Sequence, residues 1–492
     1  MFLMKQSFNI PKEVSRVTEG LEKAGFEAFV VGGCVRDLLT GKTPKDWDVT
    51  TNATPDQIQS VFPESFYEND FGTVGVKNEE TEEENLKVVE VTPYRIEGSY
   101  TNNRHPDEVK FSQNLEDDLK RRDFTMNAIA YSVSKEEMVD LYDGLTAIKD
   151  KMIIAVGEAD ERFKEDALRI LRAVRFASQH GFAISAETMS AMIKNVDLLQ
   201  NISAERIRDE FLKMIMSNEP MLGIVLSHKL GILKHIVSEL ELGIGIEQKG
   251  EHIYDVWEHN LRTMQHAADK EWPLHIRLSG LFHDIGKPHT REWSEEKNKY
   301  TFYGHEVVGA KIAKKICERL RFPGELTQKI TNLVRHHMFF ADPDEITHSA
   351  VRRLVSKVGK ENVWDLVDLR ICDRVGMGRP KEEPYRLRKY ESMIEEVMRD
   401  PVSVGMLKID GNRFVEMGYK PGREMGWVLH ALLEEVLDDP TKNTEEYLEN
   451  KSKELFELPE EKLKELGEAG KEAKDEAEDE EIGKIRKSYK VK

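Results

Sequence analysis

Cysteine, aromatic residues and long apolar runs are all scarce in this chain. Only 3 of its 492 residues are cysteines and 8% are aromatic. No stretch approaches the roughly 18 consecutive apolar residues that a membrane-spanning helix needs. Cys34, Cys317 and Cys372 are too scattered for a CxxC zinc site or a disulfide framework, and the first residues lack a signal-peptide pattern. We therefore expect a soluble, cytoplasmic protein that makes no contact with a membrane.

Acidic residues outnumber basic ones, 91 to 72, which gives a net charge of −19. Such a charge argues against a polyanionic partner, because phosphate binding requires positive charge. The acidic residues gather in two runs, 78–85 and 472–481, so basic surfaces can remain elsewhere. The stretch 370–389 is rich in basic residues and includes Tyr385, which makes it a candidate contact for an RNA backbone. A solvated helix face is the alternative interpretation.

The spacing of apolar residues changes along the chain. The first 150 residues mix helical spacing with short β-like runs at 28–31, 72–77 and 86–92, whereas helical intervals dominate from about residue 163. We predict an α+β, mainly α, multidomain protein. Its expected parts are a mixed α/β domain at 1–150, helical regions at 151–245 and 246–390, and a charged helical region or tail at 391–492.

A first group of candidate site residues follows the predicted strand at 28–31. Asp46 and Asp48 lie two residues apart in a strand-like segment, whose period of two puts both carboxylates on one face. A divalent cation relieves their repulsion, and Mg²⁺ is typically bound by one or two carboxylates together with substrate phosphates. Gly33 opens a helix that can present free N–H groups to a phosphate, and Arg36 adds a forked donor. Taken singly, these features also fit a solvated strand edge and simple glycine packing.

Several segments of the chain resemble those of a known enzyme family. GlyGlyCysValArgAsp at 32–37 and LysAspTrpAspValThr at 45–50 resemble the nucleotide-binding signature of polymerase-β-type nucleotidyltransferases, specifically the class II tRNA nucleotidyltransferases. Four further segments match that family in order, at 118–128, 140–144, 165–176 and 204–211. The resemblance covers about residues 20–240. It implies template-independent addition or repair of the 3′-terminal CCA of tRNA from CTP and ATP with Mg²⁺, with release of pyrophosphate.

The resemblance also implies roles for single residues. Asp46 and Asp48 are the expected catalytic ligands of Mg²⁺, and Glu90, on a strand-like segment, is a further candidate ligand. Asp166 and Arg169 would form a protein template that reads CTP and ATP. The expected nucleotide-binding residues are Gly33, Arg36, Arg122, Asp166, Arg169, Arg172 and Arg175. Without the other motifs, the EDxxR pattern at 165–169 would be interpreted as a helical ion pair.

The segment 95–109 resembles the loop that this family associates with the change from C to A addition. Its presence favours an enzyme that can add the terminal A. Asp123 and Asn127, in the segment at 118–128, are expected to hold their loop together by local hydrogen bonds. A long surface connection is the alternative interpretation of 95–109.

A second group of candidate ligands lies in the helical region 246–390. His259, the doublet His283-Asp284, and Asp373 resemble the ligand order of HD-domain metal-dependent phosphohydrolases, over about residues 250–375. His305 and His337 are candidate ligands of a second ion. This resemblance implies a divalent transition metal (Mn, Ni, Fe or Co) or Mg²⁺, whose bound water attacks a phosphoester. Metal binding without useful turnover is the alternative, and Lys287 is a candidate phosphate contact.

Taken together, the resemblances describe a nucleotidyltransferase head at 1–150, a helical neck and body at 151–245, an HD domain at 246–390 and a tRNA-binding or tail region at 391–492. Several alternatives remain open. The chain could add only CC or only A, or it could make poly(A) tails. The HD site could be the main activity, acting as a phosphodiesterase or phosphatase on RNA ends or nucleotides. Finally, the chain could be an RNA-binding scaffold with two inactive sites.

Overall fold

The computed structural model of the chain describes six stretches of residues: 2–68, 72–97, 109–248, 253–339, 346–379 and 382–468. The chain divides into two compact units, Met1–Ile236 and Val237–Lys492. Within the described stretches, no helix combines the length and the apolar character that crossing a membrane requires.

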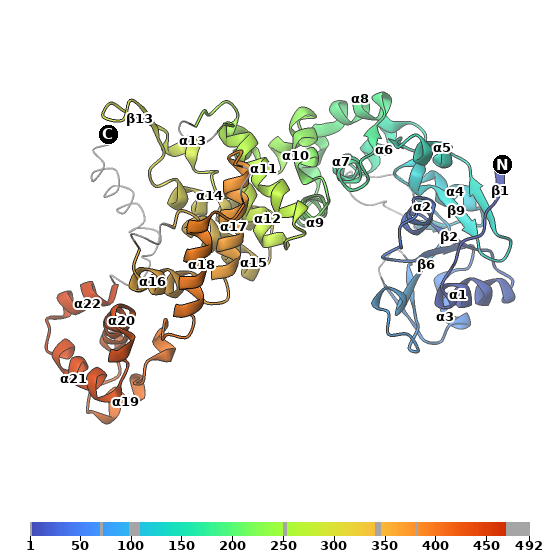
Figure 1. Cartoon of the computed structure of the whole chain (residues 1–492). Helices are drawn as coiled ribbons and strands as arrows, with labels where there is room; N and C mark the ends of the chain where they lie inside the picture. The colour runs from blue at the N-terminus through green and yellow to red at the C-terminus, as the bar shows by residue number, and fades with distance from the viewer. Residues whose placement is uncertain are drawn as a thin grey trace. The chain divides into compact units, whose positions relative to one another are not determined.

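The first unit is built on an eight-stranded sheet with the strand order β1-β10-β9-β2-β3-β6-β5-β4 (Figure 1). Its strands are β1 Phe2–Lys5, β2 Ala28–Val31, β3 Asp48–Thr51, β4 Ser65–Tyr67, β5 Val74–Lys77, β6 Val88–Pro93, β9 Ile129–Ser132 and β10 Glu137–Asp140. β3 and β6 run parallel, whereas the other neighbouring pairs are antiparallel. A small separate sheet pairs β7 Arg95–Glu97 with β8 Val109–Phe111.

Helices cover both faces of this sheet. α1 Lys12–Lys23 and α3 Pro55–Val61 bury Val14, Val17, Leu21 and Ile58 against one face. α4 Leu115–Lys120 packs Leu119 against the other face, beside Val31. Because side chains alternate along a strand, residues next to core positions such as Val49 point toward the α4 face.

The remainder of the first unit is helical. Its helices are α2 Gly33–Leu39, α5 Gly144–Lys149, α6 Ala159–Glu165, α7 Leu168–His180, α8 Ala186–Asn195, α9 Ala204–Ile215 and α10 Pro220–Lys229. A two-stranded parallel sheet joins β11 Met152–Ile153 to β12 Ala183–Ile184. α7 packs against both α9 and α10, so its arginine-rich sequence is enclosed on several sides.

The second unit is mostly helical. α11 packs against α12 and α17, and α14 packs against α15 (Figure 1). The helices are α11 Val256–Asp269, α12 Leu274–Phe282, α13 Lys287–Thr290, α14 His305–Arg319, α15 Gly324–His336, α16 His348–Val358, α17 Val363–Gly376, α18 Tyr385–Val397, α19 Gly411–Glu416, α20 Arg423–Asp438, α21 Glu445–Phe456 and α22 Glu460–Glu468. A hairpin of β13 Glu292–Ser294 and β14 Lys299–Thr301 interrupts them.

The predicted fold class, a mixed α/β head with a mainly helical remainder, is confirmed. Two local details differ from the sequence predictions. The expected strand around 46–49 begins only at Asp48, because β2 pairs with β3 no further than Val30–Val49 before the chain turns into α2. The hairpin of β13 and β14 was not predicted. The proposed boundaries at residues 150, 245 and 390 stay predictions.

Candidate functional site

The carboxylates predicted to bind a metal lie at the N-terminal end of β3. Asp48 is the first residue of β3 and lies directly opposite Glu90 of β6 in the parallel register. Asp46 lies in the bend before the strand rather than within it, and it is exposed. Since Val49 and Val91 face the core beneath α1 and α3, Asp48 and Glu90 point to the α4 face. The structure therefore brings these three predicted carboxylates together.

The electrostatics of this cluster favour a cation. Partial burial, together with Asp48, Glu68 and Asp46 nearby, raises the pKa of Glu90 to about 7. Burial also raises the pKa of Asp48, although Arg122 counteracts this effect. A raised pKa means that the charged form of the carboxylate is unfavourable, and a hard divalent ion bound there would stabilise that form. The donor set, which consists of carboxylate oxygens, fits Mg²⁺.

A phosphate-binding environment adjoins the carboxylates. Gly32, with φ +84°, precedes α2, and a Cβ on it would lie 2.8 Å from a guanidinium nitrogen of Arg122. Only glycine adopts this backbone conformation without strain and also leaves space for the arginine. Gly33 then opens α2, as predicted. Arg36 is buried, and its Nη1 donates to Asn127 at 2.8 Å.

Asp118 of α4 holds the arginines of this environment, a role that the sequence interpretation missed. Its fully buried carboxylate accepts hydrogen bonds from Arg121 Nη2 at 2.6 Å and from Arg122 Nη2 at 3.1 Å. Burial alone would raise the pKa of Asp118, but the two guanidinium groups lower it below its ordinary value. The carboxylate therefore stays charged and fixes Arg122 beside Gly32.

We expect Asp118→Asn to destabilise the head by about 3 kcal/mol, because it leaves two partly buried guanidinium groups without their carboxylate. Urea denaturation followed by circular dichroism measures this loss. Glu116→Gln, a substitution of an exposed residue on the same helix, is the matched control and should leave the denaturation midpoint unchanged. An Asp118→Asn protein as stable as the parent would contradict the assigned role.

The arginines of α7 are all held by acidic partners. Arg169 Nη1 donates to Glu165 at 2.9 Å, and its Nη2 donates to the backbone carbonyl of Arg121 at 2.8 Å. Arg172 donates to Asp123 through Nε at 2.8 Å and Nη2 at 2.6 Å. These bonds connect α7 to the segment that carries Arg122.

A second set of contacts fixes the far part of α7. Arg175 pairs with the buried Glu210 of α9 at 2.6 Å, and its guanidinium carbon lies 3.9 Å from the ring centroid of Phe176. The predicted local bond between Asn127 and Asp123 is confirmed at 3.0 Å. The helix is thus positioned by several buried charges rather than by apolar packing alone.

The side chains of Asp166 and Arg169 have different partners, although the backbone N–H of Arg169 donates to the carbonyl of Asp166 at 3.1 Å. Asp166 follows α6, and its Oδ2 accepts a hydrogen bond from Arg206 Nη2 of α9 at 2.7 Å. Its Oδ1 accepts from the backbone N–H of Leu168 at 3.1 Å. Arg206 is a contact that the sequence interpretation missed, although the fifth family-like segment, at 204–211, contains it. The carboxylate is therefore held in a fixed orientation by α9 and by the start of α7.

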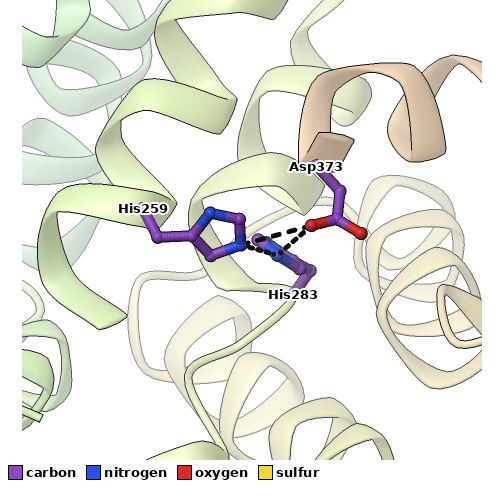
Figure 2. A group of neighbouring side chains, drawn as sticks. All are labelled: His259, His283 and Asp373. Carbon is purple, nitrogen blue, oxygen red and sulfur yellow. Dashed lines mark hydrogen bonds and ion pairs between the residues drawn. The ribbon is translucent and has the colours of Figure 1, made fainter. Parts of the chain in front are cut away.

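The histidines and carboxylates predicted in the second unit form one buried cluster. His259 of α11, His283 after α12 and Asp373 of α17 converge in Figure 2, with His259 Nε2 2.9 Å from His283 Nε2 and 3.3 Å from Asp373. His305 and His337 form a second group with Asp284, which lies 3.2 Å from both His305 and His259. All six predicted ligands thus meet, with Asp284 between the two groups.

The histidine tautomers favour metal ions in these groups. The Nδ1 atoms of His283, His305 and His337 lie 2.9, 2.7 and 2.7 Å from the backbone carbonyls of Gly280, Phe302 and Val334, which only a protonated nitrogen can satisfy. In a neutral imidazole with Nδ1 protonated, Nε2 carries the lone pair, and these Nε2 atoms face one another. Neutral imidazoles oriented by backbone carbonyls, together with two carboxylates, fit one or two divalent ions.

A cavity of about 600 Å³ opens beside the second metal group. Lys287 lines it and donates to Asp284 at 2.5 Å and to Gln248 at 2.6 Å. Arg370 also lines it and donates to Asp373 at 2.6 Å. Two cationic side chains therefore lie beside the candidate metal ligands, where they could also contact a phosphate group.

Some predicted features lie outside the described residues. These are most of the loop-like segment 95–109, of which only β7 and the start of β8 are described, and the acidic run 472–481. Two residues of the basic stretch, 380 and 381, are also outside. The described part of that stretch contributes Arg370 to the cavity.

Three family models match the chain. The Poly A polymerase head domain covers residues 28–154, the Probable RNA and SrmB- binding site of polymerase A covers residues 181–242, and the HD domain covers residues 256–378. The first of these ranges contains the carboxylates at β3 and β6. The third contains all six candidate histidine and aspartate ligands.

Known proteins are similar over between about half and nine tenths of the chain. The CCA-adding enzyme of Lactobacillus delbrueckii subsp. bulgaricus is 31% identical over 434 residues, which cover 87% of this chain and 94% of that protein. The CCA-adding enzyme of Lactococcus lactis subsp. lactis is 43% identical over 231 residues, 46% of this chain and 57% of that protein. The solved Bacillus stearothermophilus CCA-adding enzyme in complex with CTP shares the fold, with a TM-score of 0.65 at 24% identity, over 90% of this chain and 99% of that one.

Proposed function

We propose the function of this chain from one premise: it belongs to the family of CCA-adding enzymes and is a nucleotidyltransferase with an HD domain. In the proposed reaction, the head adds C, C and A to the 3′ end of tRNA from CTP and ATP and releases pyrophosphate. The observation that carries this proposal is the meeting of Asp46, Asp48 and Glu90 beside Arg122 and the start of α2.

We assign Asp46 and Asp48 as the residues that would hold Mg²⁺, with Glu90 at its margin. A bound Mg²⁺ lowers the pKa of the attacking 3′-hydroxyl and neutralises charge on the α-phosphate. Arg122, held by Asp118, would bind the triphosphate at the glycine turn. These residues position the two reactants in line and stabilise the departing pyrophosphate, which accounts for most of the catalysis in phosphoryl transfer.

We assign nucleotide choice to Asp166 and Arg169. A carboxylate can accept from the exocyclic amino group that cytosine and adenine share, while a guanidinium donates to a ring nitrogen or carbonyl. In the structure, Arg206 holds Asp166 and Glu165 holds Arg169, so neither side chain depends on the ligand for its orientation. Arg172 and Arg175 fix α7, the helix that carries Arg169.

Single-nucleotide incorporation tests this assignment of substrates. With Mg²⁺, CTP alone should extend tRNA transcripts that end at the discriminator base or at the first C. ATP alone should extend only the transcript that ends in CC. Incorporation of ATP into the transcript that ends at the discriminator base would contradict the proposed order of addition.

A second function is supported by the HD cluster. We propose that this site hydrolyses a phosphoester of an RNA end or a nucleotide. The divalent ions that would activate the attacking water would be held by His259, His283, Asp284, Asp373, His305 and His337. Water attacks phosphorus, the P–O ester bond breaks, and the products are an alcohol and a phosphate. Lys287 and Arg370 would orient the phosphate, because both reach the metal-ligating carboxylates.

The bridging position of Asp284 predicts unequal effects of two substitutions on metal content. We expect Asp284→Ala to remove most of the bound divalent metal, because this carboxylate reaches both ligand groups. His305→Ala should remove only the ion of the second group and leave the first. Metal analysis of the purified full-length protein measures both. Equal losses in the two variants, or metal retained in Asp284→Ala, would contradict the two-group arrangement.

A further inference from the structure

The β13–β14 hairpin contributes to the wall of the HD cavity, although it supplies none of the metal ligands. It is inserted between the His283-Asp284 doublet and His305, and its turn includes Asn298, with φ +46°. Lys297, Lys299 and Tyr300 from this hairpin line the cavity together with Asp284. The hairpin is therefore placed to contact whatever the cavity binds.

Aromatic rings in this part of the cavity wall each have a cationic side chain beside them. Three side chains that line it, Tyr300, Phe302 and Tyr303, each carry a cation near the ring. The distances to the ring centroids are 3.9 Å for Arg291 at Tyr300, 5.7 Å for Lys287 at Phe302, and 5.2 Å for Lys297 at Tyr303. Such interleaving of basic and aromatic groups suits a ligand that has both a phosphate and a flat ring.

Tyr300 is the most accessible of these rings. It is 37% exposed and lies opposite Trp293 in the hairpin register, where the two rings meet edge to face at 5.1 Å. Trp293 is itself 42% exposed. Large aromatic rings that are exposed on a two-stranded hairpin contribute little to a hydrophobic core. Because Tyr300 also lines the cavity, its exposed ring is available to contact a ligand there.

We propose that Tyr300 is a specificity-determining residue of the HD site and stacks on the base of a nucleoside phosphate. The phosphate of that ligand lies toward Lys287, Arg370 and the metal ligands. The cavity volume of about 600 Å³ is within the range of small-molecule sites and accommodates one nucleotide. This inference deepens the second proposed function and rests on it for the position of the phosphate. The nucleoside phosphate can be a free nucleotide or the last nucleotide of an RNA.

Stacking predicts a preference that a phosphate contact alone cannot give. Base–aromatic stacking is expected to strengthen binding by about tenfold or more. The full-length protein with Mn²⁺ should therefore bind the phosphonate analogue of AMP at least about tenfold more tightly than that of ribose 5-phosphate, which lacks the base. Tyr300→Ala should bring the two affinities close together, and Tyr300→Phe should restore the preference.

The binding is measured by quenching of tryptophan fluorescence, with Trp293→Phe as the reference that removes the local signal. Trp364→Ala, which removes an exposed ring from α17 outside the cavity lining, is the matched control and should keep the preference. Melting curves of each variant establish that it is folded. A short RNA with a 3′-phosphate, titrated in parallel, distinguishes an RNA end from a free nucleotide as the source.

Equal affinities of the parent protein for the two analogues would overturn the inference, as would a preference that survives in Tyr300→Ala. Hydrolysis is scored separately with AMP and ribose 5-phosphate. A base preference without hydrolysis would support the role of Tyr300 and contradict the proposed hydrolase. Hydrolysis of both compounds at equal rates and affinities would support the hydrolase and contradict the role of Tyr300.

Discussion

Asp48→Ala should lower nucleotidyl transfer at least about a thousandfold, which corresponds to roughly 4 kcal/mol of lost transition-state stabilisation. Asp48 is central to the head site. It lies opposite Glu90 in the sheet and interacts electrostatically with both Asp46 and Arg122. Its removal leaves the exposed Asp46 and Glu90 as the remaining candidate ligands. Incorporation of labelled CTP into tRNA measures the loss.

The same substitution should not reduce stability. Burial and the neighbouring Asp46 and Asp118 raise the pKa of Asp48, so its charged form is unfavourable in the folded chain. A site built for function is expected to carry such a cost. Thermal melting should show Asp48→Ala at least as stable as the parent. Asp150→Ala, an exposed carboxylate in the same unit, is the control that should leave both activity and melting unchanged. Transfer within tenfold of the parent in Asp48→Ala would refute the assignment.

Asp166→Ala should lose nucleotide choice more than it loses catalysis. The carboxylate is the proposed acceptor for the amino group of the incoming base, and a hydrogen bond to a charged group contributes about 1.5–3 kcal/mol. We therefore expect discrimination against GTP and UTP to fall about 10- to 100-fold, with a smaller change in the rate of correct addition. Competition between labelled nucleotides on one tRNA measures this ratio.

Asp166→Ala also removes the contacts of the carboxylate with Arg206 and with the backbone N–H of Leu168. Because Asp166 and Arg206 are both partly exposed, we expect the loss of stability to be small. Arg206→Lys keeps the charge and should retain most of the discrimination, which separates base recognition from support of the loop. Asp209→Ala, at an exposed carboxylate on α9, is the matched control. Undiminished discrimination in Asp166→Ala would contradict the template role.

Sequence patterns predicted some features of this molecule well, for identifiable physical reasons. Helix α1 follows from the spacing of Val14, Val17 and Leu21, all of which are buried. Thr54 followed by Pro55 is a pattern that predicts a helix start, and α3 begins there with a capping box between Thr54 and Gln57. The six candidate HD ligands lie together in the structure, as their order along the chain led us to expect, and their role as metal ligands stays a prediction.

Other features depend on contacts that no local pattern reveals. Asp46 lies outside β3 because the strand pairing ends before it. The roles of Asp118 and Arg206 depend on which arginine or carboxylate each one meets across the fold. Tyr300 was not singled out, because the interpretation of the region as helical left no hairpin to place it beside the cavity. The family-like segment at 204–211 was the available signal for Arg206.

The central claim, that one chain builds the whole CCA end, is tested most directly by sequencing the products on a tRNA that ends at the discriminator base. The tRNA is incubated with this protein, Mg²⁺, CTP and ATP together, and the 3′ ends are read individually. The account predicts ends that stop at CCA, with Asp48→Ala giving unextended tRNA. Ends that stop at CC, or that continue into a run of A residues, would contradict it.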